Sequence, residues 1–298
     1  MKAIISSFFC FFLISGVLFS QKPITINEDS IRFSSKKFPG FIMTIPEVNF
    51  QTVQKNWIKT LQKSTKSDVT IEKDEMTIFG ANIKDISETP INLYSKLSNN
   101  GSEVQLAVII ELKKDQYLEK ETGEAIFLKG KNYLKTFAKE QYIDFAKDEL
   151  QVEQKKLNTL KNELESLQKD KSDMQKSIQS GKTTINEETE NINLKNTELN
   201  TVTAEIYTQT GQLDAMEEGE TKMKKKEYIA DLEKRKKKLF NAIESSKNKI
   251  SKANNEIEKC NSDIPRNESK QEDIRPKIFQ QESVVQKYSD KLNSIKAY

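Results

Sequence analysis

Two kinds of hydrophobic pattern divide the chain. From residue 24 to about residue 120, apolar positions alternate with polar ones or form short runs rich in β-branched and aromatic side chains. From about residue 123 onward, single Ile and Leu residues recur among Lys, Glu, Asn, Gln and Ser. Alternation is typical of half-buried strands, and wider spacing is typical of helices with one buried stripe. The pattern therefore predicts a small globular head followed by long helices.

Strands dominate the predicted head. Residues 31–46 alternate and are interrupted at Pro39-Gly40, which indicates a strand pair or a kinked strand. Further short runs between Val69 and Ile83 predict strands hinged at Asp74-Glu75. Residues 91–97 and 103–112 flank Asn99-Asn100-Gly101, and Asn-Gly between alternating apolar runs is a strong hairpin signal.

A helix is predicted between these strands, over residues 47–63. Phe50, Val53, Trp57 and Leu61 fall at helical spacing there, so one stripe is expected to be buried. Trp57 lies on this stripe, and we expect it to pack in the core rather than to stack on a ligand. The head is thus expected to be an α+β fold with β-α-β-β-β-α order, in which helices cover an antiparallel sheet.

A seven-residue repeat runs through the second region and predicts a coiled coil. Its first series of a positions is apolar at nine of ten places: Leu150, Leu157, Leu164, Lys171, Ile178, Ile185, Ile192, Leu199, Ile206 and Leu213. A second series follows: Ile229, Lys236, Ile243, Ile250, Ile257, Ile264, Gln271, Ile278, Val285 and Leu292. The phase breaks once, between Leu213 and Ile229, so a long antiparallel helical hairpin is expected to turn there.

The hairpin turn is expected near residues 217–222, around Gly219. Folding back at that point pairs residues whose numbers add up to about 439. An alternative arrangement has four shorter helices, with further turns near Gly181 and Pro265, because glycine and proline are unfavourable inside helices. The heptad phase continues through Pro265 and Pro276, which favours the single hairpin.

Charge gives an independent indication of the same pairing. Residues 186–218 carry a net charge of −7, and residues 222–252 carry +8. A hairpin brings these segments together, so charges beside the seam attract across it. The basic residues near the turn form a candidate partner-binding tip: Lys222, Lys224, Lys225, Lys226, Lys234, Arg235, Lys237 and Lys238. An anionic envelope surface is a second candidate ligand for this tip, although a solvated or self-paired face is more common for such basic runs. Nucleic acid is a poor partner for an exported protein.

The N-terminus resembles a secretory signal peptide over residues 1–20. Met1-Lys2 precede an apolar run from Ala3 to Phe19, and the small residue Ser20 precedes a polar stretch. The run is shorter than the roughly 20 apolar residues of a membrane span, which favours cleavage over a retained anchor. We therefore expect the chain to be exported to the periplasm or cell envelope, or secreted.

Composition argues against several kinds of catalytic chemistry. The chain contains no histidine, which excludes Ser-His-Asp and Cys-His nucleophiles and the usual histidine-containing zinc sites. Cys260 is the only cysteine beyond the signal segment, so no intrachain disulfide is expected in the exported chain. Acidic residues of the head have no recognisable catalytic spacing: Glu47, Asp68, Asp74, Asp85 and Glu88. We expect no enzyme activity, no metal and no cofactor.

One short stretch resembles part of a nucleotide-binding loop. The segment "QSGKTTI" (179–185) contains Gly-Lys-Thr, but the phosphate loop requires another glycine five residues before Gly181, and that position is Lys176. Heptad positions Ile178 and Ile185 flank it in phase. We therefore expect no nucleotide here and place Gly181 at a d position, as a thin and flexible point of the helix.

Taken along the chain, these patterns predict four segments. They are a signal peptide (1–20), an α+β head (21–122), a connecting helix packed on the head (123–146) and a coiled-coil hairpin (147–298). The segments "VLFSQ", "FPGFIMTIP", "ISETPINLYSKL" and "GEAIFLKGKNYLKTFAKE", with the Lys/Glu-rich tail, resemble uncharacterised exported proteins of Gram-negative bacteria. That resemblance implies a small α/β head joined to a helical hairpin.

In outline the hairpin also resembles the arms of periplasmic chaperones of the OmpH/Skp type and the hairpins of efflux adaptors. Three functions follow as hypotheses. The first is a non-enzymatic envelope protein whose hairpin acts as a spacer, or as an oligomerising and partner-binding arm. The second is a chaperone-like clamp or holdase. The third is a ligand-binding or hydrolytic activity in the head.

Overall fold

The computed structural model describes residues 22–63 and 65–297, which form two compact units. One unit contains the head, with the residues up to Lys156 and those from Gln281 onward, and the other comprises Leu157–Gln280. The predicted signal peptide lies outside the described residues. Among the residues described, no helix is apolar over a stretch long enough to cross a bilayer.

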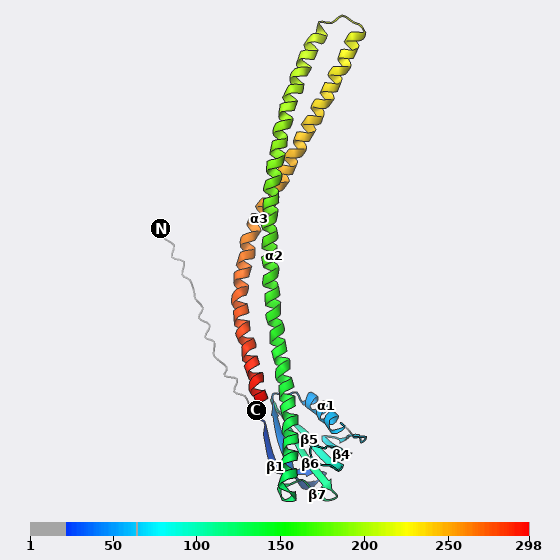
Figure 1. Ribbon diagram of the computed structural model, residues 1–298, viewed down its shortest axis with the longest axis vertical. Helices are drawn as coiled ribbons and strands as arrows, with labels where there is room; N and C mark the ends of the chain where they lie inside the picture. The colour runs from blue at the N-terminus through cyan, green and yellow to red at the C-terminus, as the bar shows by residue number, and fades with distance from the viewer. Residues whose placement is uncertain (1–21, 64, 298) are drawn as a thin grey trace, which may run out of the picture. The chain divides into compact units, whose positions relative to one another are not determined.

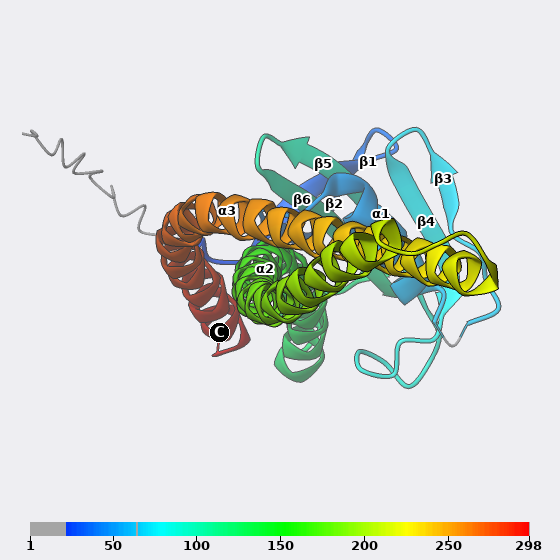
Figure 2. The same cartoon turned by 90° about the horizontal axis from the view of Figure 1, so that it is seen from above.

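Seven strands form one antiparallel sheet in the head (Figures 1 and 2). Their spatial order is β1-β2-β6-β5-β4-β3, and β7 pairs with β6. Helix α1 (Phe50–Leu61) follows β2, and a short 3₁₀ helix, η1 (Lys120–Thr122), follows β7. The strands are β1 (Thr25–Phe33), β2 (Lys36–Pro46), β3 (Thr70–Glu72), β4 (Glu75–Ala81), β5 (Ile91–Asn100), β6 (Glu103–Lys113) and β7 (Gln116–Tyr117). The predicted fold class, an antiparallel sheet with packed helices, is confirmed.

The first hairpin turns at a different place from the interruption predicted at Pro39-Gly40. The chain reverses at Ser34-Ser35, both with positive φ, and β1 pairs with β2 as far as Phe33 and Lys36. Two strands therefore precede α1, where the predicted order has one. Gly40 lies inside β2, and a Cβ there would come 2.5 Å from the carbonyl oxygen of Val108. This glycine marks close packing against β6 rather than a turn.

The second hairpin turns where the sequence predicts. Gly101 has a φ of +70° and follows Asn100, the last residue of β5. Strands β5 and β6 then pair in register from Asn100 and Glu103 to Asn92 and Glu111. Gly101 takes the left-handed backbone of this tight turn while Asn100 stays in the strand, so the glycine explains the agreement.

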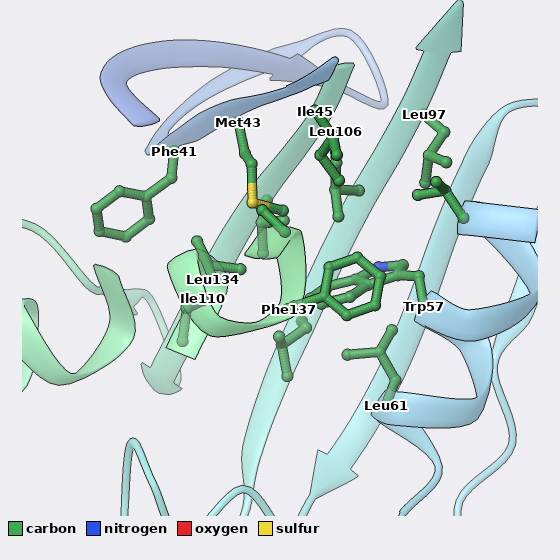
Figure 3. Close-up of a cluster of buried hydrophobic side chains, with 14 of the residues drawn as sticks. Phe41, Met43, Ile45, Trp57, Leu61, Leu97, Leu106, Ile110, Leu134 and Phe137 are labelled. Carbon is green, nitrogen blue, oxygen red and sulfur yellow. The ribbon is translucent and has the colours of Figure 1, made fainter. Parts of the chain in front are cut away.

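A large hydrophobic core lies between one face of the sheet and the helices (Figure 3). Trp57 and Leu61 of α1 are fully buried, and the ring of Phe137 packs 4.9 Å from that of Trp57. The indole Nε1 of Trp57 donates a hydrogen bond of 2.9 Å to the buried hydroxyl of Ser95. Trp57 is therefore a core residue, as predicted, and its one polar group is satisfied inside the core.

The opposite face of the sheet carries a smaller apolar cluster. Ile31, Phe33 and Ile109 are buried there, with Tyr94 packed against the ring of Phe33 at 5.3 Å. The carboxylate of Glu111 accepts hydrogen bonds from Tyr94, from Asn92 and from the backbone N–H of Asp115. Burial raises the pKa of Glu111, but these three donors outweigh it and hold the pKa below its ordinary value.

Two long helices account for the rest of the chain: α2 (Glu124–Asp214) and α3 (Glu220–Ala297). Helix α2 begins on the head and is continuous across the boundary between the two units. Gly181 lies inside α2, and Pro265 lies inside α3. The alternative with four shorter helices is therefore wrong, and the predicted single hairpin is confirmed. Within the unit Leu157–Gln280, α2 and α3 lie side by side (Figure 1).

Candidate interaction site on the helical hairpin

Residues 215–219 connect the two helices. The last turn of α2 ends with a backbone hydrogen bond from Met216 to Leu213, and the first turn of α3 begins with one from Met223 to Gly219. The ammonium of Lys222 donates to the carbonyl of Met216 at 3.0 Å. Met216 follows the last residue of α2 by two positions, so this cation lies near the negative end of the helix dipole and stabilises it.

Most of the predicted tip residues have partners within the hairpin. Lys222 and Lys224 form ion pairs one helical turn back, with Glu218 at 2.9 Å and Glu220 at 2.6 Å. The remaining contacts join Lys225 to Gln212, Lys234 to Asp231 and Arg235 to Glu198. The basic run is thus largely matched by neighbouring polar groups, although its side chains are mostly exposed.

Three tip residues have none of these contacts with other described residues. Among the described residues, no carboxylate lies within 4 Å of the ammonium groups of Lys226, Lys237 or Lys238, all of which are exposed. Between residues 205 and 238, nine basic side chains accompany eight acidic ones. The structure therefore does not gather the eight predicted residues into one pocket. It spreads them over nearly five turns of α3, in a region of almost balanced charge.

Ion pairs and packing contacts between the arms fix their register. The ammonium of Lys249 lies 2.6 Å from Glu188, and that of Lys171 lies 2.7 Å from Glu268. The residue numbers of these pairs add up to 437 and 439, which confirms the predicted pairing near 439. The hydrogen bond from Lys249, followed by one from Ser246, lowers the pKa of Glu188.

The two helices pack closely where α2 carries Gly181. Its neighbour is Ile257 of α3, and a Cβ built on Gly181 would come 2.9 Å from Cγ1 and 3.0 Å from Cδ1 of that side chain. The glycine therefore provides the space into which Ile257 packs, which is a knobs-into-holes contact. The segment "QSGKTTI" lies in mid-helix at this point, where the backbone N–H groups are used in helical hydrogen bonds.

Polar residues interrupt the seam elsewhere. Asn267 and Gln271 of α3 are both buried and are joined by a hydrogen bond of 2.7 Å. Buried polar positions reduce coiled-coil stability but fix its register. Cys260 is also buried, and burial raises the pKa of its thiol, so it behaves as a small core residue.

Only part of the apolar seam is shielded from water. Val202, Leu232 and Leu239 are buried together near the turn. Farther along, α2 seam residues are only half-buried: Leu160, Leu164, Leu167, Met174, Ile178, Ile185 and Ile192. In a two-helix coiled coil, each seam side chain is covered by one partner helix, and its other side faces water. A stripe of apolar surface therefore stays accessible along the hairpin.

The end of α3 packs into the head rather than ending on its surface. Leu292 and Ile295 belong to the main head core together with Phe137 and Tyr142 of α2. The ammonium of Lys291 is buried beside them and pairs with Glu149 of α2 at 2.7 Å. The same ammonium also pairs with Glu47, a residue of the β2–α1 connection with a φ of +63°. A buried cation thus joins three parts of the chain.

The surroundings of Lys291 favour its charged form. Burial alone lowers the pKa of an ammonium group, but the hydrogen bonds to Glu149 and Glu47 outweigh it and raise the pKa of Lys291. The rings of Phe145, Tyr142 and Tyr288 surround the ammonium at centroid distances of 5.5, 5.9 and 6.0 Å. Aromatic faces at this range add a further attraction for the cation.

Sequence reasoning missed this cluster. Lys291 looks like an ordinary member of a Lys-rich helix, and Glu47 like one of several scattered acids. The available signal is positional: Leu292 and Ile295 continue the a and d series, and residues near 291 face residues near 148 in the predicted hairpin.

The acids considered for a catalytic role in the head are not gathered at one place. Glu47 binds Lys291, Asp74 pairs with Lys96 at 2.6 Å, and Asp68 accepts from Gln62 at 3.1 Å. In the described part of the chain, no three His, Cys, Asp or Glu side chains form a cluster suited to a metal ion.

Comparison with known proteins assigns the chain to no family. No protein family model matches the chain, and no curated protein sequence matches it. One similar solved structure is a coiled-coil segment of Smc from Pyrococcus yayanosii. It is 16% identical, with a TM-score of 0.42, and the alignment covers 56% of this chain and 70% of that one. At that level the similarity carries no argument about what this chain does.

Proposed function

We propose that this chain is a non-enzymatic, exported envelope protein whose helical hairpin acts as a structural spacer or as a partner-binding or oligomerisation module. The observation that carries the proposal is the pairing of α2 with α3, in which both ends of the hairpin belong to one head core. A helix pair whose two ends share one core can present a long, continuous surface to a partner. The resemblance to exported Gram-negative proteins adds support for the location.

Site-specific photo-crosslinking tests the proposal directly. A photoreactive residue at Lys226, Lys238 or Tyr207 samples exposed positions of the hairpin, and one at Lys84 samples the head as a control. In intact cells of the native host we expect discrete adducts from the hairpin positions, either with a second copy or with another protein. Mass spectrometry of the adducts distinguishes the two. The absence of adducts from all three hairpin positions would contradict the proposed role.

Export is tested separately. Cell fractionation combined with N-terminal sequencing is expected to find the chain in the envelope, starting after Ser20. A chain that stays in the cytoplasm would remove export from the proposal while leaving the role of the hairpin open to the crosslinking test.

A chaperone-like holdase is a second candidate, and the half-buried seam of α2 favours it. An accessible apolar stripe can bind apolar segments of an unfolded client. Because both ends of the hairpin are fixed in the head core, we expect clients to bind along the stripe rather than between separated arms. Suppression of the aggregation of an unfolded outer-membrane protein would support this function, and undiminished aggregation at equimolar chain would count against it.

A further inference from the structure

A second surface, in the head, has the chemistry of a docking groove. An open cavity of about 1070 Å³ lies between α1 and the part of α2 that packs beside it. The side chains of α1 form one wall, with Lys55, Lys59 and Lys63, and those of α2 form the other. This groove is part of the head unit and is independent of the role proposed for the hairpin.

All charged residues of the α1 wall are basic. Helix α1 buries Val53, Trp57 and Leu61 on its inner face, which leaves Lys55, Lys59 and the following Lys63 exposed on its outer face at four-residue spacing. No carboxylate of a described residue lies within 4 Å of any of these three ammonium groups. Like charges one turn apart repel each other, so the row lacks the internal matching seen at the hairpin tip.

The floor of the groove is apolar and held in place. Ile58 and Ile143 line it, both half-buried and packed against the main core. Beside them Asn56 donates a hydrogen bond of 2.6 Å to the buried Gln141, which ties α1 to α2. The floor is therefore preformed, and a ligand does not have to order it.

The opposite wall, formed by α2, differs in charge from the α1 wall. Glu140 and Asp144 of α2 line it, and Asp144 pairs with Lys147 at 2.9 Å. One wall is thus positive and the other is mixed. A symmetric contact between two copies through α1 would bring the lysine rows together, which disfavours a second copy of this chain as the occupant.

We propose that this groove binds an acidic amphipathic helix of a partner protein. Lys55 and Lys59 are about 6 Å apart along α1, at 1.5 Å per residue, and Lys63 follows just beyond its end. This spacing matches glutamates one turn apart on a helix lying alongside. The apolar face of the same helix covers Ile58 and Ile143. This is a helix-in-groove mode, in which the apolar floor provides affinity and the lysine row selects the partner and its orientation.

A labelled peptide tests the proposal on the full-length protein. The probe has about 18 residues, long enough for appreciable helicity, with glutamates along one edge beside a leucine face. Fluorescence anisotropy is expected to show saturable binding that weakens with salt. Combining Lys55→Gln, Lys59→Gln and Lys63→Gln is expected to weaken it about tenfold, because each exposed ion pair contributes modestly. The matched control combines Lys36→Gln, Lys84→Gln and Lys114→Gln, which alter exposed head lysines outside the groove, and is expected to bind normally.

Several outcomes would overturn the proposal. They are no binding at about 1 mM peptide, equal weakening by the control variant, and equal binding of a scrambled peptide of the same composition. Binding of a heparin fragment with the same dependence on the three lysines would show a general polyanion site and would equally overturn it. Circular dichroism of both triple variants checks that the fold is retained, since the altered side chains are all exposed.

Discussion

Gly181 shows what a missing side chain does in a coiled coil. We predict that Gly181→Ala lowers the free energy of unfolding by about 1 kcal/mol, because crowding of Ile257 costs about 1–3 kcal/mol and the better helix propensity of alanine returns about 1 kcal/mol. In an Ile257→Ala background the crowding is absent, so the same change is expected to stabilise by about 1 kcal/mol. Thermal unfolding followed by circular dichroism measures both.

The reversal of sign is the test of this contact. If Gly181→Ala stabilises the protein equally in both backgrounds, then Ile257 does not pack on the glycine as the structure has it. In that case the sequence-based view of Gly181 as a flexible point would be the better description.

Lys291 is the second residue whose change should be costly. We predict that Lys291→Ala lowers the free energy of unfolding by about 2–3 kcal/mol, because Glu47 and Glu149 are left facing each other without the cation. This loss lies at the lower end of the range for breaking a buried ion pair, because both carboxylates are partly exposed to water. Hydrogen exchange at the last turns of α3 and thermal unfolding report it.

The matched control is Lys287→Ala, an exposed lysine one turn earlier on α3. It is expected to change the free energy of unfolding by less than about 0.5 kcal/mol. Equal effects of the two changes would show that Lys291 contributes only as a surface charge.

At the scale of helices and strands, the sequence is informative where local chemistry demands one geometry. The heptads and Asn100-Gly101 identify the hairpin helices and the β5–β6 turn, because each needs a specific residue type at fixed spacing. Ser34 and Ser35 carry no such signal, yet they adopt the left-handed backbone. Their turn is held by pairing of the flanking strands and by Glu75, which accepts two hydrogen bonds from Ser34. Tertiary contacts of this kind cannot be predicted from local propensity.

The sequence predicts the two candidate interaction surfaces to different degrees, because local sequence does not reveal tertiary contacts. The basic residues near the turn stand out in the sequence, but their ion pairs with Glu218, Glu220 and Glu198 depend on side-chain geometry. The groove between α1 and α2 joins residues about 85 positions apart, such as Asn56 and Gln141. Only the folded head brings its two walls together.

Register makes the arms a matched pair, and this predicts how they tolerate shortening. Removing residues 185–198 from α2 and 239–252 from α3 deletes two heptads from each arm along the same stretch of the seam. We expect this variant to fold with paired helices, since the a and d positions stay in phase. Removing 185–198 alone shifts every pair beyond the deletion, and we expect loss of helix content and aggregation. Circular dichroism and size-exclusion chromatography compare the two, and indistinguishable behaviour would contradict the pairing.

At the scale of the whole molecule, carboxylates in ion pairs and hydrogen bonds make stability depend on acid. The pKa values of Glu188, Glu153 and Glu218 are lowered, chiefly by hydrogen bonds from Lys249, Lys156 and Lys222. A carboxyl whose folded pKa lies below its unfolded value of 4.5 stabilises the fold above that pH. We therefore predict that the thermal midpoint is level near neutrality and falls as the pH drops below about 4.5.

Lys291 predicts the opposite dependence at high pH. Its folded pKa lies above the ordinary 10.5, so its contribution is present below that pH and is lost as the pH rises through the folded value.

Scanning calorimetry from pH 3 to 7 tests the predicted loss of stability in acid. Glu188→Gln is expected to lower the midpoint at pH 7 and to weaken its pH dependence, whereas a midpoint that rises on acidification would contradict the assignment.

The packing of Leu292 and Ile295 into the head core also sets the order in which the chain can fold. The sheet and α1 are complete by residue 117, but the core that they share lacks these two side chains until the last turns of α3 arrive. During synthesis the head therefore stays incompletely packed while more than half of the chain is still being made. Its final closure joins segments far apart in sequence, which is a slow kind of contact to form. A head that closes late stays loosely packed for longer, and a loosely packed chain is easier to unfold for the export proposed above.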